Sequence, residues 1–463
     1  MQRILAIAWL TWKAALRFKL FLVIATLLIL AVVGLPLVIQ DDGSAQGFTQ
    51  IILTYTLSTI TALLGLSTLW LACGTLARDI EECQIQVVAT KPVARWQIWL
   101  GKWLGIVSLN AALLAISGGC VYALLQYRAS KLPAAVQQTL REQILVARGS
   151  AKEASREGEI ETTTDRILQE KVKSAAIESE ADRLELRNQI RESLRADSQV
   201  VPPNWARTWK IDLGFAKHYL AGKPLQLRVK FNTAQGTSTG TFDAFWRVGD
   251  PPKTKLWQNE EPMSLAPDTF HEFVIPPDLF DENGILTITF MNPNNTALLF
   301  SPQEGMEVLY PQGGFALNYA RGLGIIFCWM ALLAALGLAA ASELSFPVAA
   351  FFALAMLLVV FSSGTLAESV ESGSVAAGNV EKGVAGHSIM DGVLIPSFKA
   401  VLAVVSLAKN YSPIDALSTG RSITWGELGQ AFIQIVLVLG GFFALAGIAL
   451  FSRRELAAAQ GTQ

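Results

Sequence analysis

Few residues in this chain have the types and spacing that chemistry at an active site requires. Residues 236–240 (Gly-Thr-Ser-Thr-Gly) match a nucleophile pattern, but that motif needs a strand, a sharp turn and a following helix, and this stretch is a Thr- and Gly-rich connection. His218, His271 and His387 lie far apart and lack metal-ligand spacing. The sequence has no Gly-x-x-x-x-Gly-Lys-Ser/Thr loop to hold the phosphates of ATP. We therefore expect no catalytic, cofactor-binding or metal-binding residues and no enzymatic activity in this chain.

The composition is that of a membrane protein interrupted by one large aqueous insert. Of 463 residues, 52% are hydrophobic and 16% are charged, and residues 127–315 hold 22 of the 37 basic and 25 of the 38 acidic residues. A helix that crosses a ~30 Å hydrocarbon core needs about 20 apolar residues. Six stretches without Asp, Glu, Lys or Arg reach that length, namely 20–39, 51–77, 103–125, 322–342, 346–367 and 428–452. The expected fold is a polytopic α-helical membrane protein with six transmembrane helices and an α+β extracytoplasmic domain between helices 3 and 4.

The positions of Lys and Arg predict that both termini are cytoplasmic. With the N-terminus inside, ten basic residues near span ends fall on that side, against four in the last outer segment, 368–427. The large insert then lies outside, in the periplasm if the membrane is a bacterial inner (plasma) membrane, and it contains no cysteine that could form a disulfide. The net charge of -1 gives no case for nucleic-acid binding. The spans lack ionisable residues, which argues against a proton-coupled carrier.

The insert divides into a helical part and a β-rich part. Residues 127–199 are predicted to form a helical stalk or hairpin that is broken near Gly149 and Gly158. Residues 200–315 are predicted to form an antiparallel β-sandwich, because alternating runs are separated by Gly, Pro, Asn and Asp. The four runs are 225–231, 241–248, 269–275 and 285–292. Residues 273–292 resemble the closing strands of galactose-binding-like jelly rolls.

Arginine recurs at every fourth position in the second half of the stalk, at Arg183, Arg187, Arg191 and Arg195. Such a row could bind anionic headgroups or glycans. We favour a solvated face, because Glu residues alternate with these arginines and neutralise much of their charge.

The loop between the second and third spans carries the most specific pattern. Acidic residues follow Arg78, an apolar stretch comes next, and residues 91–96 (Lys-Pro-Val-Ala-Arg-Trp) precede a helix with Lys102 at its base. Proline suits the first turn of a helix, where its missing N–H has no intrahelical partner. The pattern predicts a short cytoplasmic helix at about 84–98. The plainer interpretation is that the basic residues only set the topology.

In this loop the chain resembles the permease subunits of ABC-2 type transporters, in which the loop forms a coupling helix that docks into a groove of a separate ATPase. Residues 1–18 look like the family's amphipathic interfacial helix, and residues 451–456 (Phe-Ser-Arg-Arg-Glu-Leu) are similar to its Phe-x-Arg-Arg-Glu ending. The resemblance covers the membrane segments, 1–126 and 316–463. The large outer domain departs from the compact members of the family.

The resemblance implies an exporter subunit with a cytosolic ABC ATPase as partner, and ATP and magnesium would be bound on that ATPase. It also implies a second permease copy or a paralogous permease, with membrane lipid around the spans. The residues expected to contact the ATPase are Lys91, Pro92, Val93, Arg95, Trp96 and Ile98. An alternative remains open, a non-transporting membrane scaffold or sensor whose outer domain binds glycan, peptide or envelope protein.

The expected domains follow the same division. They are the interfacial helix 1–18, transmembrane helices 1–3 in 19–126, the stalk 127–199, the β-sandwich 200–315, and 316–463 with transmembrane helices 4–6 and a cytoplasmic tail. In the last of these, the apolar but short segment at about 385–412 contains Pro396 and Lys399, and we interpret it as a re-entrant or interfacial helix. Residues 424–427 (Thr-Trp-Gly-Glu) then predict a capping box for the last span.

Overall fold

The structure is a computed structural model. It describes residues 2–17, 19–38, 45–82, 93–134, 137, 140, 145–175, 180–233, 240–302, 304–362, 391–409 and 411–454. The chain forms two compact units: unit 1 comprises Met1–Ala147 and Gly313–Gln463, and unit 2 is Arg148–Gln312.

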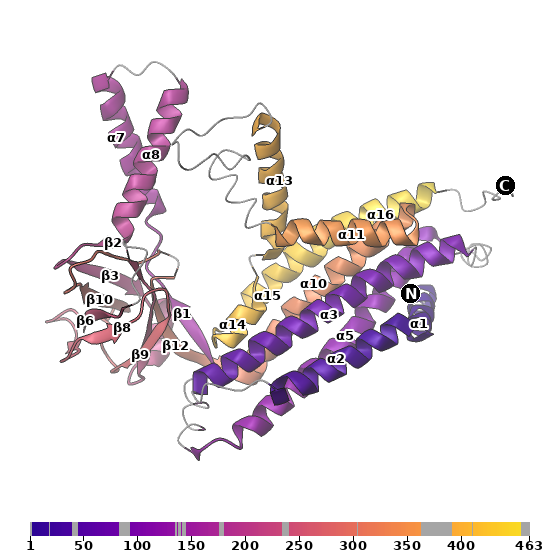
Figure 1. Cartoon of the computed structure of the whole chain (residues 1–463), viewed down its shortest axis with the longest axis horizontal. Helices are drawn as coiled ribbons and strands as arrows, with labels where there is room; N and C mark the ends of the chain where they lie inside the picture. Colours follow the sequence, from indigo (N-terminus) through magenta and orange to yellow (C-terminus); the bar gives the residue numbers. More distant parts are fainter. Residues whose placement is uncertain are drawn as a thin grey trace. The chain divides into compact units, whose positions relative to one another are not determined.

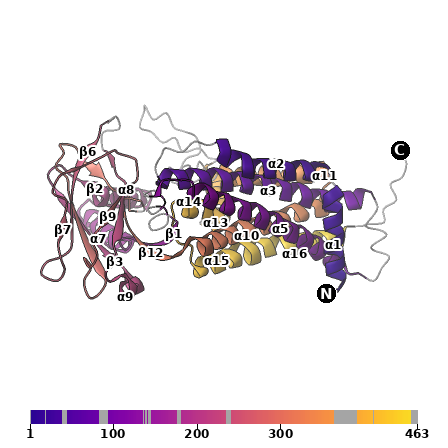
Figure 2. The same ribbon diagram turned by 90° about the horizontal axis from the view of Figure 1, so that it is seen from below.

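Unit 1 is helical, and its long helices run alongside one another (Figures 1 and 2). Its described elements are α1 (Gln2–Arg17), α2 (Lys19–Val38), α3 (Ala45–Glu81), α5 (Arg95–Ala129), α10 (Phe315–Glu343), α11 (Phe346–Phe361), α13 (Asp391–Lys409), α14 (Pro413–Ser418), α15 (Trp425–Ala431), the π-helical segment η4 (Phe432–Gly440) and α16 (Gly441–Arg453). α15, η4 and α16 together make one continuous span, Trp425–Arg453.

Four described helices are long and apolar enough to cross a membrane. They are Thr49–Glu81, Arg95–Ala129, Phe315–Glu343 and Trp425–Arg453. A fifth span results if the pair Gln2–Arg17 and Leu22–Leu35, bent by 77°, counts as one. The helix α11 is apolar but has only 16 residues, and the expected continuation of this span, 363–367, lies outside the described residues. Unit 1 is therefore the membrane-embedded part of the chain.

Small residues let the central helix α10 approach its neighbours closely. A Cβ atom on Gly337 would lie 2.7 Å from Cβ of Ala72 in α3, and one on Gly447 in α16 would lie 2.9 Å from Cα of Ala339. Lipid tails are as apolar as the helices, so the hydrophobic effect does not drive helix association within a membrane. Close van der Waals packing of this kind supplies much of the attraction instead. The small-residue pattern explains why α10 packs against α3, α5 and α16.

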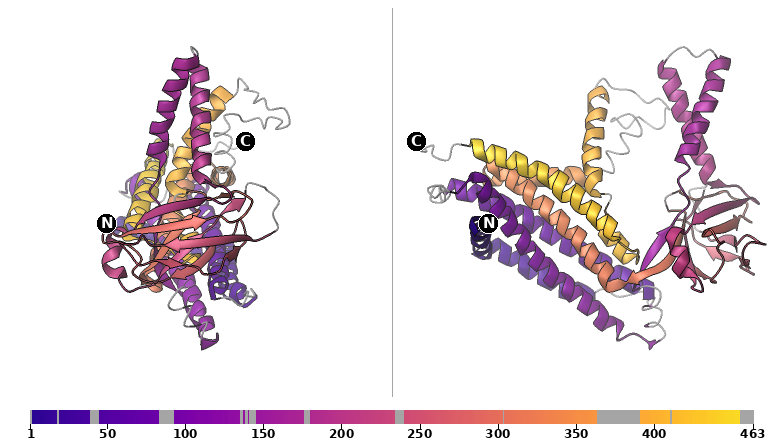
Figure 3. Two further views of the ribbon diagram at one scale, coloured as in Figure 1. Left: turned by 90° about the vertical axis from the view of Figure 1, so that its left-hand side faces the viewer. Right: turned by 180° about the vertical axis from the view of Figure 1, so that it is seen from behind.

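The segment before the last span has two features that the sequence predicts. α13 contains Pro396, is apolar over Pro396–Ala408, and lies at a steep angle to α11 and α16 (Figures 1 and 3). Its predicted start at 385–390 lies outside the described residues. The capping box at the start of the last span is confirmed, because Oγ1 of Thr424 accepts from N–H of Glu427 (3.1 Å) and the Glu427 carboxylate accepts from N–H of Thr424 (2.7 Å).

Unit 2 is an α+β unit built on antiparallel strand pairs. Its strands are β1 (Val146–Ala151), β2 (Val200–Val201), β3 (Ala206–Asp212), β4 (Leu225–Val229), β5 (Asn232–Thr233), β6 (Phe242–Val248), β7 (Trp257–Gln258), β8 (Met263–Leu265), β9 (His271–Ile275), β10 (Ile285–Met291), β11 (Leu298–Leu299) and β12 (Met306–Gly314). One sheet has the order β1-β12-β4-β9, a second has the order β3-β10-β6-β7 with β8 on β6, and β2-β11-β5 form a third. The four predicted β-runs correspond to β4, β6, β9 and β10.

The core of unit 2 is aromatic and centres on Trp246, which is 1% exposed. Its ring lies 4.8 Å from that of Phe290, 5.8 Å from that of Phe273 and 6.3 Å from that of Trp209, measured between centroids. Large aromatic side chains bury much apolar area each, so they stabilise a unit that has no disulfide. The alternation along β6 and β10 directs these side chains inward.

The helices α7 (Glu157–Ala175) and α8 (Glu180–Gln199) form the predicted hairpin, and they stand side by side and extend away from the strands (Figures 1 and 3). Arg187 of the arginine row pairs with Glu161 (2.8 Å) and Asp165 (3.2 Å) of α7. Arg195 pairs with Glu157, also on α7. Arg195 also pairs with Glu192 of its own helix (3.2 Å), and Arg191 lies 3.9 Å from the same carboxylate. The row is thus neutralised by acidic residues of both helices, of which the sequence predicted those on the same helix.

The prediction of a helical stalk over 127–199, broken near Gly149 and Gly158, is wrong for the residues around the first break. Residues 146–151, with Gly149 among them, form strand β1, which is hydrogen-bonded to β12. A Cβ atom on Gly149 would lie 2.3 Å from the ring of Tyr310, so glycine there allows the two strands to pack. The strand depends on a partner about 160 residues further along the chain, and no local pattern reveals such pairing.

Candidate functional site at the polar end of unit 1

The residues predicted to contact an ATPase fall on both sides of the start of α5. Lys91 and Pro92, and most of the predicted helix 84–98, lie outside the described residues. Val93 precedes α5, whereas Arg95, Trp96 and Ile98 form its first turn. Over its described part, the predicted coupling segment is therefore the beginning of a membrane-spanning helix. The Gln97 side chain accepts a hydrogen bond from N–H of Ala94 (3.3 Å) and helps to fix this start.

Arg95 holds the end of the last span. Its Nη1 donates to the carbonyl oxygens of Phe451 (3.0 Å), Ser452 (2.7 Å) and Arg454 (2.8 Å). The last carbonyls of a helix lack intrahelical donors and carry partial negative charge, so a guanidinium there satisfies both needs. The first turn of α5 and residues 451–454 of the Phe-x-Arg-Arg-Glu ending are thus joined by Arg95. The sequence indicated each of these two segments by itself but did not predict the contact between them.

Two helical turns further along α5, Lys102 is 6% exposed and needs a partner. Its Nζ donates to a carboxylate oxygen of Asp79 (2.5 Å) and to the carbonyl of Thr75 (2.8 Å), both in α3. The Asp79 side chain is 35% exposed, so one partner of this pair still reaches the surface.

The end of α3 also holds the start of α11. The Glu81 carboxylate accepts from N–H of Phe346 (2.9 Å), one of the amides that a helix start leaves unpaired. The Arg78 guanidinium lies 4.7 Å from the centroid of the Phe346 ring, at cation–π distance. At the end of α10, the carbonyl of Ser342 accepts from Arg454 (3.1 Å). We call the region defined by Asp79, Arg95, Lys102, Ser342 and Arg454 the polar end of unit 1.

Helix α1 packs against α5 beside this polar end. A Cβ atom on Gly101 would lie 2.7 Å from Cβ of Ile7, and one on Gly105 would lie 2.8 Å from the carbonyl oxygen of Ala8. Nε1 of Trp12 donates to Oγ of Ser108 (2.9 Å). Gly101 and Gly105 have the Gly-x-x-x-Gly spacing that allows two helices to touch. Sequence reasoning missed this pair, although its spacing is visible in the sequence.

The accessible surface of the predicted contact residues is uneven. Trp96 is 45% exposed, whereas Ile98 is 3% exposed and belongs to the apolar core. Val93 is half-buried and packs against the same core, and Arg95 is engaged with the end of α16. Among the described residues of the predicted contact, Trp96 is therefore the one large apolar side chain that is exposed.

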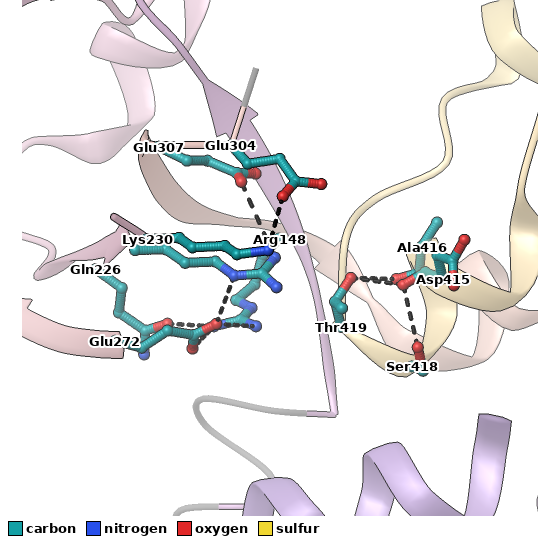
Figure 4. Close-up of polar contacts among 11 residues, drawn as sticks. Arg148, Gln226, Lys230, Glu272, Glu304, Glu307, Asp415, Ala416, Ser418 and Thr419 are labelled. Carbon is teal, nitrogen blue, oxygen red and sulfur yellow. Dashed lines mark hydrogen bonds and ion pairs between the residues drawn. The ribbon is translucent and has the colours of Figure 1, made fainter. Parts of the chain in front are cut away.

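A second polar cluster lies in unit 2, across the sheet β1-β12-β4-β9 (Figure 4). Arg148 pairs with Glu272 (2.8 Å) and donates to Gln226 (2.5 Å). Arg228, whose register partners are Glu272 on β9 and Glu307 on β12, pairs with both. Charges of alternate sign on neighbouring strands fix the strand register, so we assign this cluster a structural role.

Beside this cluster, Lys230 pairs with Glu304 (3.2 Å; Figure 4). It also pairs with Asp268 (3.3 Å), and hydrogen bonds to both carboxylates raise the pKa of Lys230 above its ordinary value. Figure 4 also shows the turn of α14 in unit 1, where Oγ1 of Thr419 donates to the carbonyl of Asp415 (2.6 Å). Within the part of the chain that the structure describes, no group of three or more His, Cys, Asp or Glu side chains is arranged to hold a metal ion.

Comparison of the chain with protein-family models, with curated proteins and with solved structures found no match.

Proposed function

We propose that this chain is the permease subunit of an ABC-2 type exporter, driven by a separate cytosolic ATPase that binds ATP and magnesium. The observation that carries the proposal is the polar end of unit 1, where the ends of four helices are joined around the start of α5 and Trp96 is exposed beside them. An ATPase that drives a conformational change in a membrane protein must act on a rigid part of that protein. The links from Arg95 to α16 and from Lys102 to α3 would pass a displacement of this end into the spans.

The topology of the proposal follows the charge distribution. The polar end and both termini face the cytoplasm, six segments span a bacterial inner membrane, and unit 2 lies in the periplasm as a jelly-roll-like sandwich with a helical stalk. Two copies, or this chain and a paralogous permease, form the transmembrane pathway. Its direction is export, and unit 2 receives or hands on the cargo.

The test is binding and stimulation of the partner ATPase by Trp96→Ala. The gene beside this one is expected to encode a soluble ATPase with a Walker motif. Removal of a central aromatic anchor costs about 2 kcal/mol or more, so we expect affinity for that ATPase to fall roughly 30-fold or more. Stimulation of its ATP hydrolysis by this subunit should fall in parallel. Pull-down and ATPase assays on the purified proteins measure both.

Trp425→Ala is the matched control. Trp425 is 63% exposed and begins the span whose other end Arg95 holds, about 42 Å away for 29 helical residues. It should bind and stimulate the ATPase like the unaltered chain. If Trp96→Ala also behaves like the unaltered chain, Trp96 is no part of a coupling surface, and a scaffold or sensor becomes the better description.

A further inference from the structure

The connection between β3 and β4 presents aromatic side chains to solvent. In this segment, residues 213–224, which we call the Phe215 loop, Leu213, Ala216 and Leu220 point into the core of unit 2. Phe215 is 92% exposed and Tyr219 is 41% exposed. The loop contains the short helix α9 (Lys217–Leu220), which lies at the periphery of unit 2, beyond the strands (Figure 2).

The loop is held in this shape, so the exposure of Phe215 is built into the fold. Gly214 has a φ of 53°, which a residue with a side chain rarely adopts, and its N–H donates to a carboxylate oxygen of Asp212 (2.7 Å). At the other end of the loop, N–H of Gly222 donates to a carboxylate oxygen of Asp278 (2.8 Å). Ala216 and Leu220, which lie between these two glycines, pack into the core of unit 2 and anchor the loop.

Basic groups surround the exposed rings. Lys217 donates to the carbonyl of Glu282 (3.1 Å), Nζ of Lys223 lies 5.7 Å from the centroid of the Tyr219 ring, and His218 is exposed between them. The neighbouring carboxylates of Asp212, Asp278 and Asp281 accept hydrogen bonds from backbone N–H groups. One exposed apolar side chain needs no explanation, but aromatic rings flanked by Lys and His are typical of segments that sit at a lipid–water interface.

The covalent chain keeps this loop near a membrane span. The Tyr219 ring lies 6.4 Å from the ring of Tyr310 on β12. β12 ends at Gly314 and α10 begins at the next residue, Phe315, with no connecting loop. Five residues of extended chain span at most about 17 Å, so Tyr219 is tethered close to the point where a membrane-crossing helix begins.

We propose that the Phe215 loop docks on the lipid–water interface of the membrane that α10 crosses. Phe215 and Tyr219 lie at the boundary between headgroups and acyl chains, and Lys217, His218 and Lys223 face the lipid phosphates. Because acidic residues flank the loop, insertion of the rings contributes more than attraction to charged lipid. This proposal does not depend on an ATPase partner and holds for an exporter or a scaffold alike.

The test uses the full chain in nanodiscs of phosphatidylethanolamine and phosphatidylglycerol. Cys83 and Cys120 are replaced by Ser, whereas the buried Cys73 and Cys328 stay, and an environment-sensitive fluorophore is attached at Phe215→Cys. The matched control carries the fluorophore at Trp205→Cys, because Trp205 is 66% exposed and lies at the other end of β3. We expect blue-shifted emission, quenched by nitroxide-labelled lipid, at position 215 and water-like, unquenched emission at position 205.

Two outcomes overturn the proposal. Water-like emission at both positions shows that the loop faces solvent, and blue-shifted emission at 215 without quenching by lipid shows that a protein surface covers it. A measurement without any substitution checks the result independently. A lipid with a photoactivatable headgroup-proximal diazirine should crosslink to residues 213–224 of the unaltered chain, and absence of these crosslinks, with crosslinks to α10 present, contradicts the proposal.

Discussion

The ammonium of Lys102 and the guanidinium of Arg95 lie two helical turns apart on α5, and each joins α5 to another helix through backbone carbonyls. Lys102 reaches the carbonyl of Thr75 as well as Asp79, and Arg95 reaches three carbonyls of the last span. A buried cation is tolerated only where acceptors surround it. At the residue scale, both side chains therefore act first as links between helices.

Replacement of Asp79 and replacement of Lys102 should lower the stability of the protein by unequal amounts. Asp79→Ala strands a buried ammonium, and we expect a loss of about 3 kcal/mol of stability. Lys102→Met leaves a carboxylate that still reaches solvent and should lose only about 1 kcal/mol. Tryptophan fluorescence during thermal unfolding in detergent shows which of the two variants is less stable. The double variant should recover much of the Asp79→Ala loss, and equal losses in the two single variants would argue against a desolvated Lys102.

Replacement of Arg95 should have a local effect on the end of the last span, near the opposite end of the sequence. Without its guanidinium, the carbonyls of Phe451, Ser452 and Arg454 lose a donor, so Arg95→Ala should destabilise the last turn of α16 by about 1 to 2 kcal/mol. Hydrogen–deuterium exchange of the amides in residues 449–454 should accelerate. Arg95→Lys should retain part of the protection, because an ammonium reaches fewer acceptors. Unchanged exchange in Arg95→Ala would mean that this contact does not hold the span.

At the scale of the element, the association of α1 with α5 depends on the absence of two side chains. Gly101 and Gly105 let the backbone of α1 come into contact with α5, and Trp12 adds one hydrogen bond. Helix α1 is thus packed on the span whose first turn carries Arg95 and Trp96. Any displacement of this span should move α1 with it.

Gly105→Ala should detach or shift α1. Its Cβ would lie 2.7 Å from Cβ of Thr11 and 2.8 Å from the Ala8 carbonyl oxygen, and overpacking of this kind costs about 1 to 3 kcal/mol. Gly119→Ala is the control, because no atom lies within 4 Å of the added Cβ and alanine favours the same helix by about 1 kcal/mol. Limited proteolysis within residues 2–17 measures the release of α1. Equal protection in both variants would refute close packing at Gly105.

At the scale of the whole molecule, the chain separates a membrane-embedded unit from an α+β unit with a core of its own. The core of unit 2 gathers residues from β3, β4, β6, β9, β10 and β12, all within residues 148–312. Charged pairs between α7 and α8 complete the hairpin inside the same unit. Unit 2 has what an independent domain requires.

The fragment 146–314, which includes all of β1 and β12, should fold by itself. We expect a soluble protein that unfolds cooperatively with a free energy of about 5 to 15 kcal/mol, typical of single domains. Its unfolding should not respond to a reducing agent, since all four cysteines of the chain lie outside it. Circular dichroism and the fluorescence of the buried Trp209 and Trp246 report the transition. A gradual, non-cooperative transition would show that unit 2 needs unit 1 to fold.

The sequence alone determined the features that depend on neighbours in the chain. Uninterrupted apolar stretches predicted the four long spans, alternation predicted β4, β6, β9 and β10, and the Thr424–Glu427 pattern predicted a cap. Each of these is a local property. A helix forms its backbone hydrogen bonds within its own segment, and the alternation of side chains along a strand shows which of its faces is apolar.

The tertiary structure decided the features that depend on distant partners. The stalk was predicted to break near Gly149, but strand β1 was not predicted there because its pairing with β12 has no local signature. The contact of Arg95 with the last span joins residues 356 or more positions apart. Ile98, predicted as a contact residue, is buried in the core because α10 and α16 pack around the start of α5. Spacing along the chain indicates which face of a helix is apolar. Only the packing of helices from distant parts of the sequence determines which residues of that face remain exposed.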